Sequence, residues 1–213
     1  YGGLIMKNVF IIVHGIDINK GGMTTAILNR SKNFYDNKVN ANIVTFNYKT
    51  NYDAIISLLK KQDKMDKRTK VFNLFQYYNE KSSLKNKKYN KKLYRLLKKW
   101  FKNTIEIKEK SNISSFFDSN TGEYKAYKVL KNEEEIVIDL FNNNRRFKRL
   151  YLKNNNIHKI NTFNPGNEII NETFYSNKGF PYISRDIDPK SGKIKKIYLL
   201  TDKIQFNNNI ELC

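Results

Sequence analysis

The stretch IIVHGIDINKGGMTTAILNRS, residues 11–31, joins a short apolar run to a pair of glycines and then to a sequence with helical periodicity. The apolar run begins at residue 8 and is typical of a strand buried on both faces of a parallel sheet. Apolar side chains at Met23, Ala26, Ile27 and Phe34 suit one face of a helix. The stretch therefore predicts a strand, a glycine turn and a helix, which is the first unit of an α/β fold.

The same alternation continues to about residue 78. Residues 41–46 predict a second strand, residues 52–62 a second helix and residues 70–78 a third strand. Both helices are expected on one face of the sheet, because crossover connections between parallel strands are right-handed. Three strands are too few to stand alone, so we expect residues 1–79 to form a partial Rossmann-like segment.

Residues 80–103 are basic and amphipathic, with Leu93, Leu97 and Trp100 at helical spacing and lysines on the other face. Residues 60–110 hold 18 Lys or Arg and 5 Asp or Glu, a local balance of +13 in a chain whose formal net charge is +20. We expect a helical connector whose charged face is either simply solvated or in contact with a membrane surface or a polyanion.

From residue 104 the helical period disappears. Short segments rich in Ile, Tyr, Phe and Val alternate with turns rich in Asn, Gly, Asp and Pro, as in an antiparallel meander. The ten segments are 104–110, 113–118, 124–130, 134–141, 147–153, 157–163, 168–175, 180–187, 196–204 and 209–213. Gly179 and Gly192 are available for positive φ in the turns. Alternation of polar and apolar residues predicts one wet face and one packed face for a sheet over residues 104–213. Such a sheet is also a candidate surface for another subunit.

Composition excludes several classes of protein. Hydrophobic residues at 39% and aromatic residues at 14% are too many for a disordered chain. A single cysteine, Cys213, cannot form an internal disulfide, and with His14 and His158 it cannot make a zinc set, so we expect a cytoplasmic protein without a metal. The longest apolar stretches are far below the roughly 20 residues of a membrane span.

The charge of +20 should attract polyanions, among which nucleic acid, anionic lipid and phosphate polymers all qualify. The abundance of Lys, Asn and Ile is also what an AT-rich genome produces, so codon bias is an alternative source of part of the excess. A nucleic-acid-binding protein is the disfavoured alternative, because no basic helix-turn-helix, RNP aromatic signature or zinc spacing is present. A pure assembly module is a third hypothesis.

The glycine turn has two interpretations on its own chemistry. Gly21 and Gly22 let backbone N–H groups approach an anion at the positive end of the following helix, but the spacing matches neither the dinucleotide fingerprint nor the Walker loop. A simple tight corner is the alternative. His14 is a candidate for catalysis or for capping and packing, Asp17 for a general base or a turn former, and His158 is expected to be structural.

Longer segments carry a more specific signal. VFIIVHGIDINKGGMTTAILNRSKNFYD, ANIVTFNYKTNYD, KMDKRTKVFNLFQYY, NTIEIKEK, GEYKAYKVL and IDLFNNNRRFKRLY together resemble the N-terminal part of bacterial wall teichoic acid α-glycosyltransferases. These are the poly(ribitol-phosphate) or poly(glycerol-phosphate) enzymes of the retaining, two-Rossmann-domain class (GT-B, glycosyltransferase family 4). The resemblance extends from about Met6 to the last residue, so the sequence predicts an α/β plus β fold: an incomplete GT-B N-terminal domain and an inserted antiparallel β-sheet domain.

The resemblance implies transfer of glucose or N-acetylglucosamine from a UDP-sugar to polyol-phosphate teichoic acid, at the cytoplasmic side of the membrane. It implies that the donor is held mainly by a second Rossmann domain outside this chain, with its carboxylate pair, so we expect no catalytic residue here and no activity from this chain alone. No cofactor is expected beyond the UDP-sugar substrate. The β domain is expected to serve oligomerisation, as a trimer, and a peripheral membrane contact remains open.

Two sets of binding residues follow from the resemblance and the charge. Gly21 and Gly22 match the family's glycine-rich loop at the cleft between the Rossmann domains, and Lys20, Met23 and Thr24 flank it. A teichoic acid carries one phosphodiester per polyol unit, so a protein that binds along it needs spaced cations. The residues expected to contact this polyanion are Lys87, Lys88, Lys91, Lys92, Arg145, Arg146 and Lys148.

Overall fold

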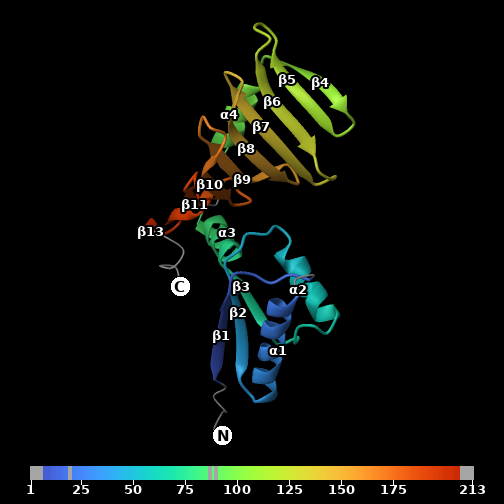
Figure 1. Ribbon diagram of the computed structural model, residues 1–213, viewed down its shortest axis with the longest axis vertical. Helices are drawn as coiled ribbons and strands as arrows, with labels where there is room; N and C mark the ends of the chain where they lie inside the picture. Colours follow the sequence, from blue (N-terminus) through green and yellow to red (C-terminus); the bar gives the residue numbers. More distant parts are fainter. Residues whose placement is uncertain (1–6, 19–20, 86–87, 89–90, 207–213) are drawn as a thin grey trace. The chain divides into compact units, whose positions relative to one another are not determined.

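The computed structural model describes residues 7–18, 21–85, 88 and 91–206 (Figure 1). The chain forms two compact units, Tyr1–Tyr77 and Tyr78–Cys213, and the boundary falls within helix α3 (Leu74–Lys85). In the described residues, no helix is both long enough and apolar enough to cross a bilayer. An α/β unit followed by a β unit confirms the predicted fold class.

The first unit is a three-stranded parallel sheet in the order β1-β2-β3. Its strands are β1 (Asn8–Val13), β2 (Asn40–Thr45) and β3 (Lys70–Asn73), and its helices are α1 (Gly22–Asp36) and α2 (Tyr52–Lys61). The strands are in register from Asn8 opposite Asn40 to Val13 opposite Thr45, and Thr45 is opposite Asn73. All three strands therefore end at one edge.

One face of this sheet carries the core, and the other does not. Leu28, Ile43, Tyr52 and Leu59 are at most 3% exposed and belong to a cluster against which Ile11, Val13 and Val71 pack. Side chains alternate along a strand, so Phe10, Ile12 and Phe72 point to the opposite face. They are 58%, 55% and 49% exposed, whereas parallel sheets normally bury both faces. The partial character of the sheet, expected from its three strands, is visible in this exposed apolar face.

The prediction of a strand over residues 70–78 was wrong beyond Asn73. The side-chain Oδ1 of Asn73 accepts the backbone N–H of Gln76 at 3.1 Å, which caps the start of α3. Phe75, Tyr78 and Ser82 are buried at helical spacing on that helix. Phe75 and Tyr78, which suggested a strand, therefore lie on the buried side of a helix, whereas Tyr77 is 55% exposed.

The second unit is a ten-stranded antiparallel meander in which each strand pairs with its sequence neighbours, in the order β13 to β4. It is preceded by helix α4 (Lys92–Trp100). The strands are β4 (Thr104–Lys110), β5 (Ile113–Asp118), β6 (Tyr124–Leu130), β7 (Glu135–Asn142), β8 (Arg145–Lys153), β9 (Asn156–Phe163), β10 (Ile169–Tyr175), β11 (Pro181–Ile187), β12 (Ile194–Leu199) and β13 (Ile204–Phe206). The first eight confirm the expected segments with ends shifted by at most two residues.

The end of the meander differs from expectation. The segment 196–204 was expected to be one strand, but a turn with Lys203 at φ 58° separates β12 from β13. In that turn the carboxylate of Asp202 pairs with Lys81 at 2.7 Å and with Lys85 at 3.3 Å. These ion pairs favour a turn over a continuous strand. The expected strand 209–213 lies outside the described residues.

Asparagine makes two of the hairpin turns. Asn143 and Asn144 have φ values of 49° and 57°, and Asn154 and Asn155 have φ values of 48° and 61°. Two consecutive residues with positive φ are the requirement of the type I′ turn, whose twist matches that of paired strands. Gly179 and Gly192, at φ 76° and 67°, confirm the expected positive-φ positions.

Helix α4 packs on one face of the meander. Leu93, Leu97 and Trp100 lie against a cluster that includes Leu140, Leu150 and Ile160. The hydroxyl of Tyr94 accepts the backbone N–H of Ile157 at 3.1 Å. The apolar side of α4 is therefore used within this unit. The division of the chain at residues 79 and 103 stays a prediction.

The opposite face of the meander carries a network of ion pairs. Asp139, 6% exposed, accepts two hydrogen bonds from Arg149 at 2.6 and 2.7 Å. Glu172 of β10 pairs with Arg185 of β11 at 2.5 Å and with Lys159 of β9 at 3.2 Å. Burial raises the pKa of Glu172, but the two cations more than offset this and hold its pKa below the usual range. The register continues this face with Phe174, Ile183 and Ile197, which are at most 2% exposed, so the expected wet face is found only in part.

Candidate functional site

The carboxyl ends of β1, β2 and β3 define the candidate site, because ligands of open parallel sheets bind beyond this edge. His14, Gly15 and Asp17 follow β1, Asn47 and Lys49 follow β2, and Asn73 ends β3. These polar residues come from three separate parts of the sequence. Their meeting follows directly from the parallel register of the strands.

Asp17 has a structural role in the β1–α1 loop. Its carboxylate pairs with the ammonium of Lys49 at 2.5 Å and accepts the backbone N–H of Ile18 at 2.9 Å. This is the turn-forming role, which was the alternative to a general base. The side chain of His14 is exposed, and its carbonyl oxygen accepts the backbone N–H groups of Phe46 and Asn47 at 3.1 and 2.9 Å.

The glycine turn lies at the start of α1. Gly21 is the N-cap, with φ −57° and ψ −143°, and neither a capping side chain nor an acidic residue occupies the first turn of the helix. A Cβ added at Gly21 or Gly22 would meet nothing within 4 Å. Neither positive φ nor close packing within the described chain therefore requires glycine here. No side chain of the described residues caps the first N–H groups of the helix.

The residues that flank the glycines differ in exposure. Met23 is 75% exposed, whereas Thr24 is 4% exposed. The hydroxyl of Thr24 makes no hydrogen bond with the described part of the chain, although the side chain lines a groove beside the helix. Lys20 lies outside the described residues. The structure therefore brings Gly21, Gly22, Met23 and Thr24 together at one helix end.

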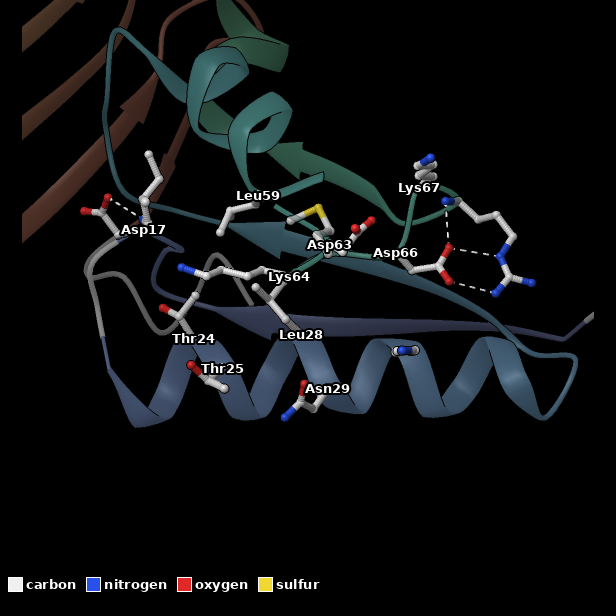
Figure 2. A pocket seen from close by; sticks show the side chains of 14 residues that line it. Asp17, Thr24, Thr25, Leu28, Asn29, Leu59, Asp63, Lys64, Asp66 and Lys67 are labelled. Atoms are coloured by element: carbon white, nitrogen blue, oxygen red, sulfur yellow. Dashed lines mark hydrogen bonds and ion pairs between the residues drawn. The ribbon is translucent and has the colours of Figure 1, made fainter. Parts of the chain in front are cut away.

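The groove follows α1 and has a volume of about 700 Å³ (Figure 2). Thr24, Thr25 and Asn29 lie on the α1 side, and residues 63–68, between α2 and β3, lie on the other, with Asp17 at one end. Its floor includes the apolar side chains of Leu28 and Leu59. The lining mixes lysines with aspartates, so the groove is polar at its rim without a strong charge of one sign.

One end of the groove is held by an ion pair. Asp66 accepts the side-chain Nε and Nη2 of Arg68 at 2.9 and 2.7 Å, together with the backbone N–H of Arg68 at 2.8 Å. These hydrogen bonds lower the pKa of Asp66 to about 2, and those from the side chain of Arg68 contribute most. Within the described part of the chain, no three His, Cys, Asp or Glu side chains are grouped as a metal site would need.

The cations expected to contact a polyanion do not form one surface. Lys88, Lys91 and Lys92 are exposed at or before the start of α4, whereas Lys87 lies outside the described residues. Arg145 is exposed at the start of β8. Arg146 is engaged within the sheet, where it pairs with Asp139 at 3.2 Å and lies over the ring of Phe163 at 4.2 Å.

The two faces of the meander separate these cations further. Asp139 and Arg149 alternate with Leu140 and Leu150, which contact the α4 side, so Arg146 reaches the face opposite α4 through its pair with Asp139. Lys148 stands opposite Leu140 in the register and is half-buried.

The exposed face of α4 is basic, as the sequence predicts. Besides Lys92 it presents Arg95, Lys98 and Lys99, with Leu96 58% exposed among them, and Lys102 is exposed just beyond the end of the helix. A cavity of about 440 Å³ near the end of the helix is lined by Lys99, Trp100, Lys102 and Lys125. The helical spacing of 3–4 residues is the signal in the sequence that could also have found Arg95 and Lys102.

The comparisons with known proteins follow the whole described fold. No family model matches the chain. The chain is 49% identical over 208 residues to the poly(ribitol-phosphate) alpha-N-acetylglucosaminyltransferase of Staphylococcus aureus (strain COL), across 98% of this chain and 42% of that protein. The chain thus spans less than half the length of this curated relative.

Solved structures give the same result. A crystal structure of TarM superposes with a TM-score of 0.92 and 48% identity, over 99% of this chain and 42% of that one. A variant of S. aureus TarM in complex with fondaparinux, alpha-GlcNAc-glycerol and UDP gives the same TM-score and identity, over 98% and 42%. The pneumococcal O-GlcNAc transferase GtfA, at 12% identity and a TM-score of 0.57 over 96% of this chain and 39% of that one, shares the fold.

Proposed function

We propose that this chain, a homologue of the N-terminal part of the TarM-type poly(ribitol-phosphate) glycosyltransferase of S. aureus, belongs to an enzyme that glycosylates wall teichoic acid. In this proposal a retaining GT-B enzyme transfers N-acetylglucosamine or glucose from a UDP-sugar to a polyol-phosphate polymer. The observation that carries the proposal is the 49% identity along 98% of the chain, together with the TM-score of 0.92.

The strand-end edge supplies the chemistry that the proposal needs from this chain. An uncapped helix N-terminus next to small residues accepts anionic oxygens, and both substrates carry phosphate groups. Gly21, Gly22 and the flanking Lys20, Met23 and Thr24 are proposed to form this contact. The residues of this chain are proposed to bind and orient the substrates. The catalytic residues are proposed to lie in a second Rossmann domain, so this chain alone is expected to be inactive.

The test uses the full-length protein that carries this chain. Purified protein is incubated with radiolabelled UDP-N-acetylglucosamine or UDP-glucose and with poly(ribitol phosphate) or poly(glycerol phosphate), and label in the polymer is measured. Transfer of at least one sugar to at least one polymer is expected from the full-length protein and none from residues 1–213. Absence of transfer in all four combinations would refute the proposal.

We further propose that the exposed cations of α4 bind the polymer at a point distant from the polyol unit that receives the sugar. The outward face of α4 presents Arg95, Lys98 and Lys99, Lys102 follows the helix, and no ion pair with the described residues neutralises them. Because the apolar side of the helix packs on the sheet, this face is suited to an electrostatic contact rather than to insertion into a bilayer. The contact with substrate is proposed to take place on the cytoplasmic side of the membrane.

Assembly is the second candidate function of the meander. β4 is an edge strand of the ten-stranded sheet, and its Ile105 and Ile107 are 55% and 51% exposed. Open edges with apolar side chains favour pairing with another chain. We therefore keep a trimer formed through the β unit as a proposal. Light scattering over a range of concentrations tests it: a constant mass of 25.3 kDa for the chain would contradict it.

A further inference from the structure

The loop between β1 and α1 is held by a tyrosine of α2. The hydroxyl of Tyr52 accepts the backbone N–H of Ile16 at 3.2 Å and donates to the side-chain Oδ1 of Asn47 at 2.6 Å. Tyr52 and Ile16 are each 1% exposed, so water does not replace either partner. One hydroxyl thus joins the loop after β1 to the loop after β2.

Asn47 is itself fixed in place. Its side chain lies so close to Gly15 that an added Cβ there would be 2.3–2.4 Å from the carboxamide atoms. Its backbone N–H donates to the carbonyl of His14 at 2.9 Å, and its own carbonyl accepts the side chain of Asn73 at 2.9 Å. The backbone of Asn47, whose side chain accepts the Tyr52 hydroxyl, is therefore hydrogen-bonded to residues at the ends of both β1 and β3.

A second attachment lies one residue further along the loop. Lys49, which like Asn47 follows β2, pairs with Asp17 at 2.5 Å, and the same Asp17 carboxylate accepts the N–H of Ile18. The two attachments hold residues 16–18, which precede the glycine turn in the sequence. The helix α1 packs on the core by its own side chains, whereas the position of residues 16–18 depends on these contacts.

We infer that Tyr52, Asn47 and Lys49 are positioning residues, which hold residues 14–18, the described part of the β1–α1 loop, at the strand-end edge. This inference rests on the proposed function for its consequence, because the glycine turn is the proposed contact for a phosphate group of the substrates. Tyr52→Phe leaves the buried N–H of Ile16 and the half-buried Oδ1 of Asn47 without this partner, and the loop must move to satisfy the N–H.

The test compares Tyr52→Phe with Tyr35→Phe. Tyr35 is a matched control, because its hydroxyl is also buried in the first unit and also makes two hydrogen bonds, to the carbonyls of Ala41 and Arg68 at the other edge of the sheet. Amide hydrogen exchange of the 213-residue chain is measured by mass spectrometry. Tyr52→Phe is expected to speed exchange at Ile16 and in residues 14–18 by about tenfold or more, and Tyr35→Phe only near residues 35–41 and 66–69.

Kinetics of the full-length protein test the consequence. Tyr52→Phe is expected to lower kcat/KM by about tenfold, whereas Tyr35→Phe, with a similar fall in melting temperature, is expected to change it less than about twofold. Lys49→Met, at a side chain that is 21% exposed, provides a variant that folds if Tyr52→Phe does not, with the same expected direction in both assays.

The outcomes separate the inference from the function. Unchanged exchange at residues 14–18 in both Tyr52→Phe and Lys49→Met overturns the attachment of the loop. Faster exchange with kcat/KM equal to that of Tyr35→Phe overturns its positioning role. A full-length wild-type protein without any transfer refutes the proposed function, and hydrogen exchange still decides whether the loop is held as inferred.

Discussion

Replacing Gly15 with alanine tests the packing at the strand-end edge. The new Cβ would lie 2.3–2.4 Å from Oδ1, Cγ and Nδ2 of Asn47, well inside van der Waals contact, so the carboxamide must move. Overpacking of this kind costs about 1–3 kcal/mol, and a buried Tyr52 hydroxyl without its acceptor costs about 1–3 kcal/mol more. We expect the first unit to lose about 2–5 kcal/mol, since the two costs overlap.

Hydrogen exchange measures this loss where it occurs. Amides of β1 and β2 should exchange at least about thirtyfold faster in Gly15→Ala, which corresponds to about 2 kcal/mol. Gly22→Ala is the matched control, because its Cβ meets nothing within 4 Å and alanine favours helix by up to about 1 kcal/mol. The single tryptophan, Trp100, belongs to the second unit, so its fluorescence in urea should be unchanged by either variant.

Exchange rates in Gly15→Ala that stay within about threefold of the wild type would refute this reasoning. Such a result would mean that Asn47 can move at little cost. The network that ties Tyr52 to the β1–α1 loop would then not be rigid.

Three further predictions concern the second unit and its surface. Burial, with Lys159 and Lys153 nearby, lowers the pKa of His158 to about 4. The unfolded chain therefore takes up the proton of this imidazole at a higher pH than the folded chain does. The free energy of unfolding of the second unit should fall by about 3 kcal/mol as pH falls from 6.5 to 4. In urea titrations followed by Trp100 fluorescence, His158→Phe should lack this part of the pH dependence; an identical dependence would contradict it. Asp139→Asn should cost about 3 kcal/mol by leaving Arg149 without its partner, whereas Glu134→Gln, 4.0 Å from Lys153 at an exposed pair, should cost almost nothing; equal costs would be inconsistent with a strong buried pair. Lys98→Glu with Lys99→Glu should weaken binding of poly(ribitol phosphate) to the chain about tenfold at low salt and less at high salt, as measured by isothermal titration calorimetry, and the exposed control Lys131→Glu with Lys190→Glu should change it much less; equal effects would point to overall charge alone.

Strong local patterns in the sequence predicted the architecture. The apolar run of β1, the helices α1 and α2, and eight segments of the meander all appear in the structure. Each of these segments repeats its apolar residues over a length sufficient to bury one face. Turn residues such as Asn143 and Asn144 favour the observed hairpins. The expected packed face of α1 was wrong, because Met23 is 75% exposed and the buried residues of the helix are Thr24, Leu28, Ser31 and Tyr35.

The sequence was least informative where tertiary contacts decide. Phe75 and Tyr78 fit a strand by composition, and only the cap by Asn73 and their burial on one side of α3 make them helical. The turn at Asp202 depends on Lys81 and Lys85, which lie more than a hundred residues away in the sequence. No local pattern reports such partners.

Binding residues were harder to predict than the elements that carry them. The sequence predicts Arg146 to be available for a polyanion, but in the structure its guanidinium pairs with Asp139 and lies over the ring of Phe163. Tyr52 reads as the first residue of an amphipathic helix, and its role in holding the β1–α1 loop emerges only when Ile16 and Asn47 are placed beside it.

The order of the ten strands has a consequence for how such a sheet is assembled. Every strand pairs with the one before it and the one after it in the chain, so each hairpin closes a short loop and contributes contacts of low sequence separation. A hairpin can then be gained or lost at the terminal edge without rerouting any other connection. The meander is in this respect extensible, and its length can change over evolution independently of the parallel sheet.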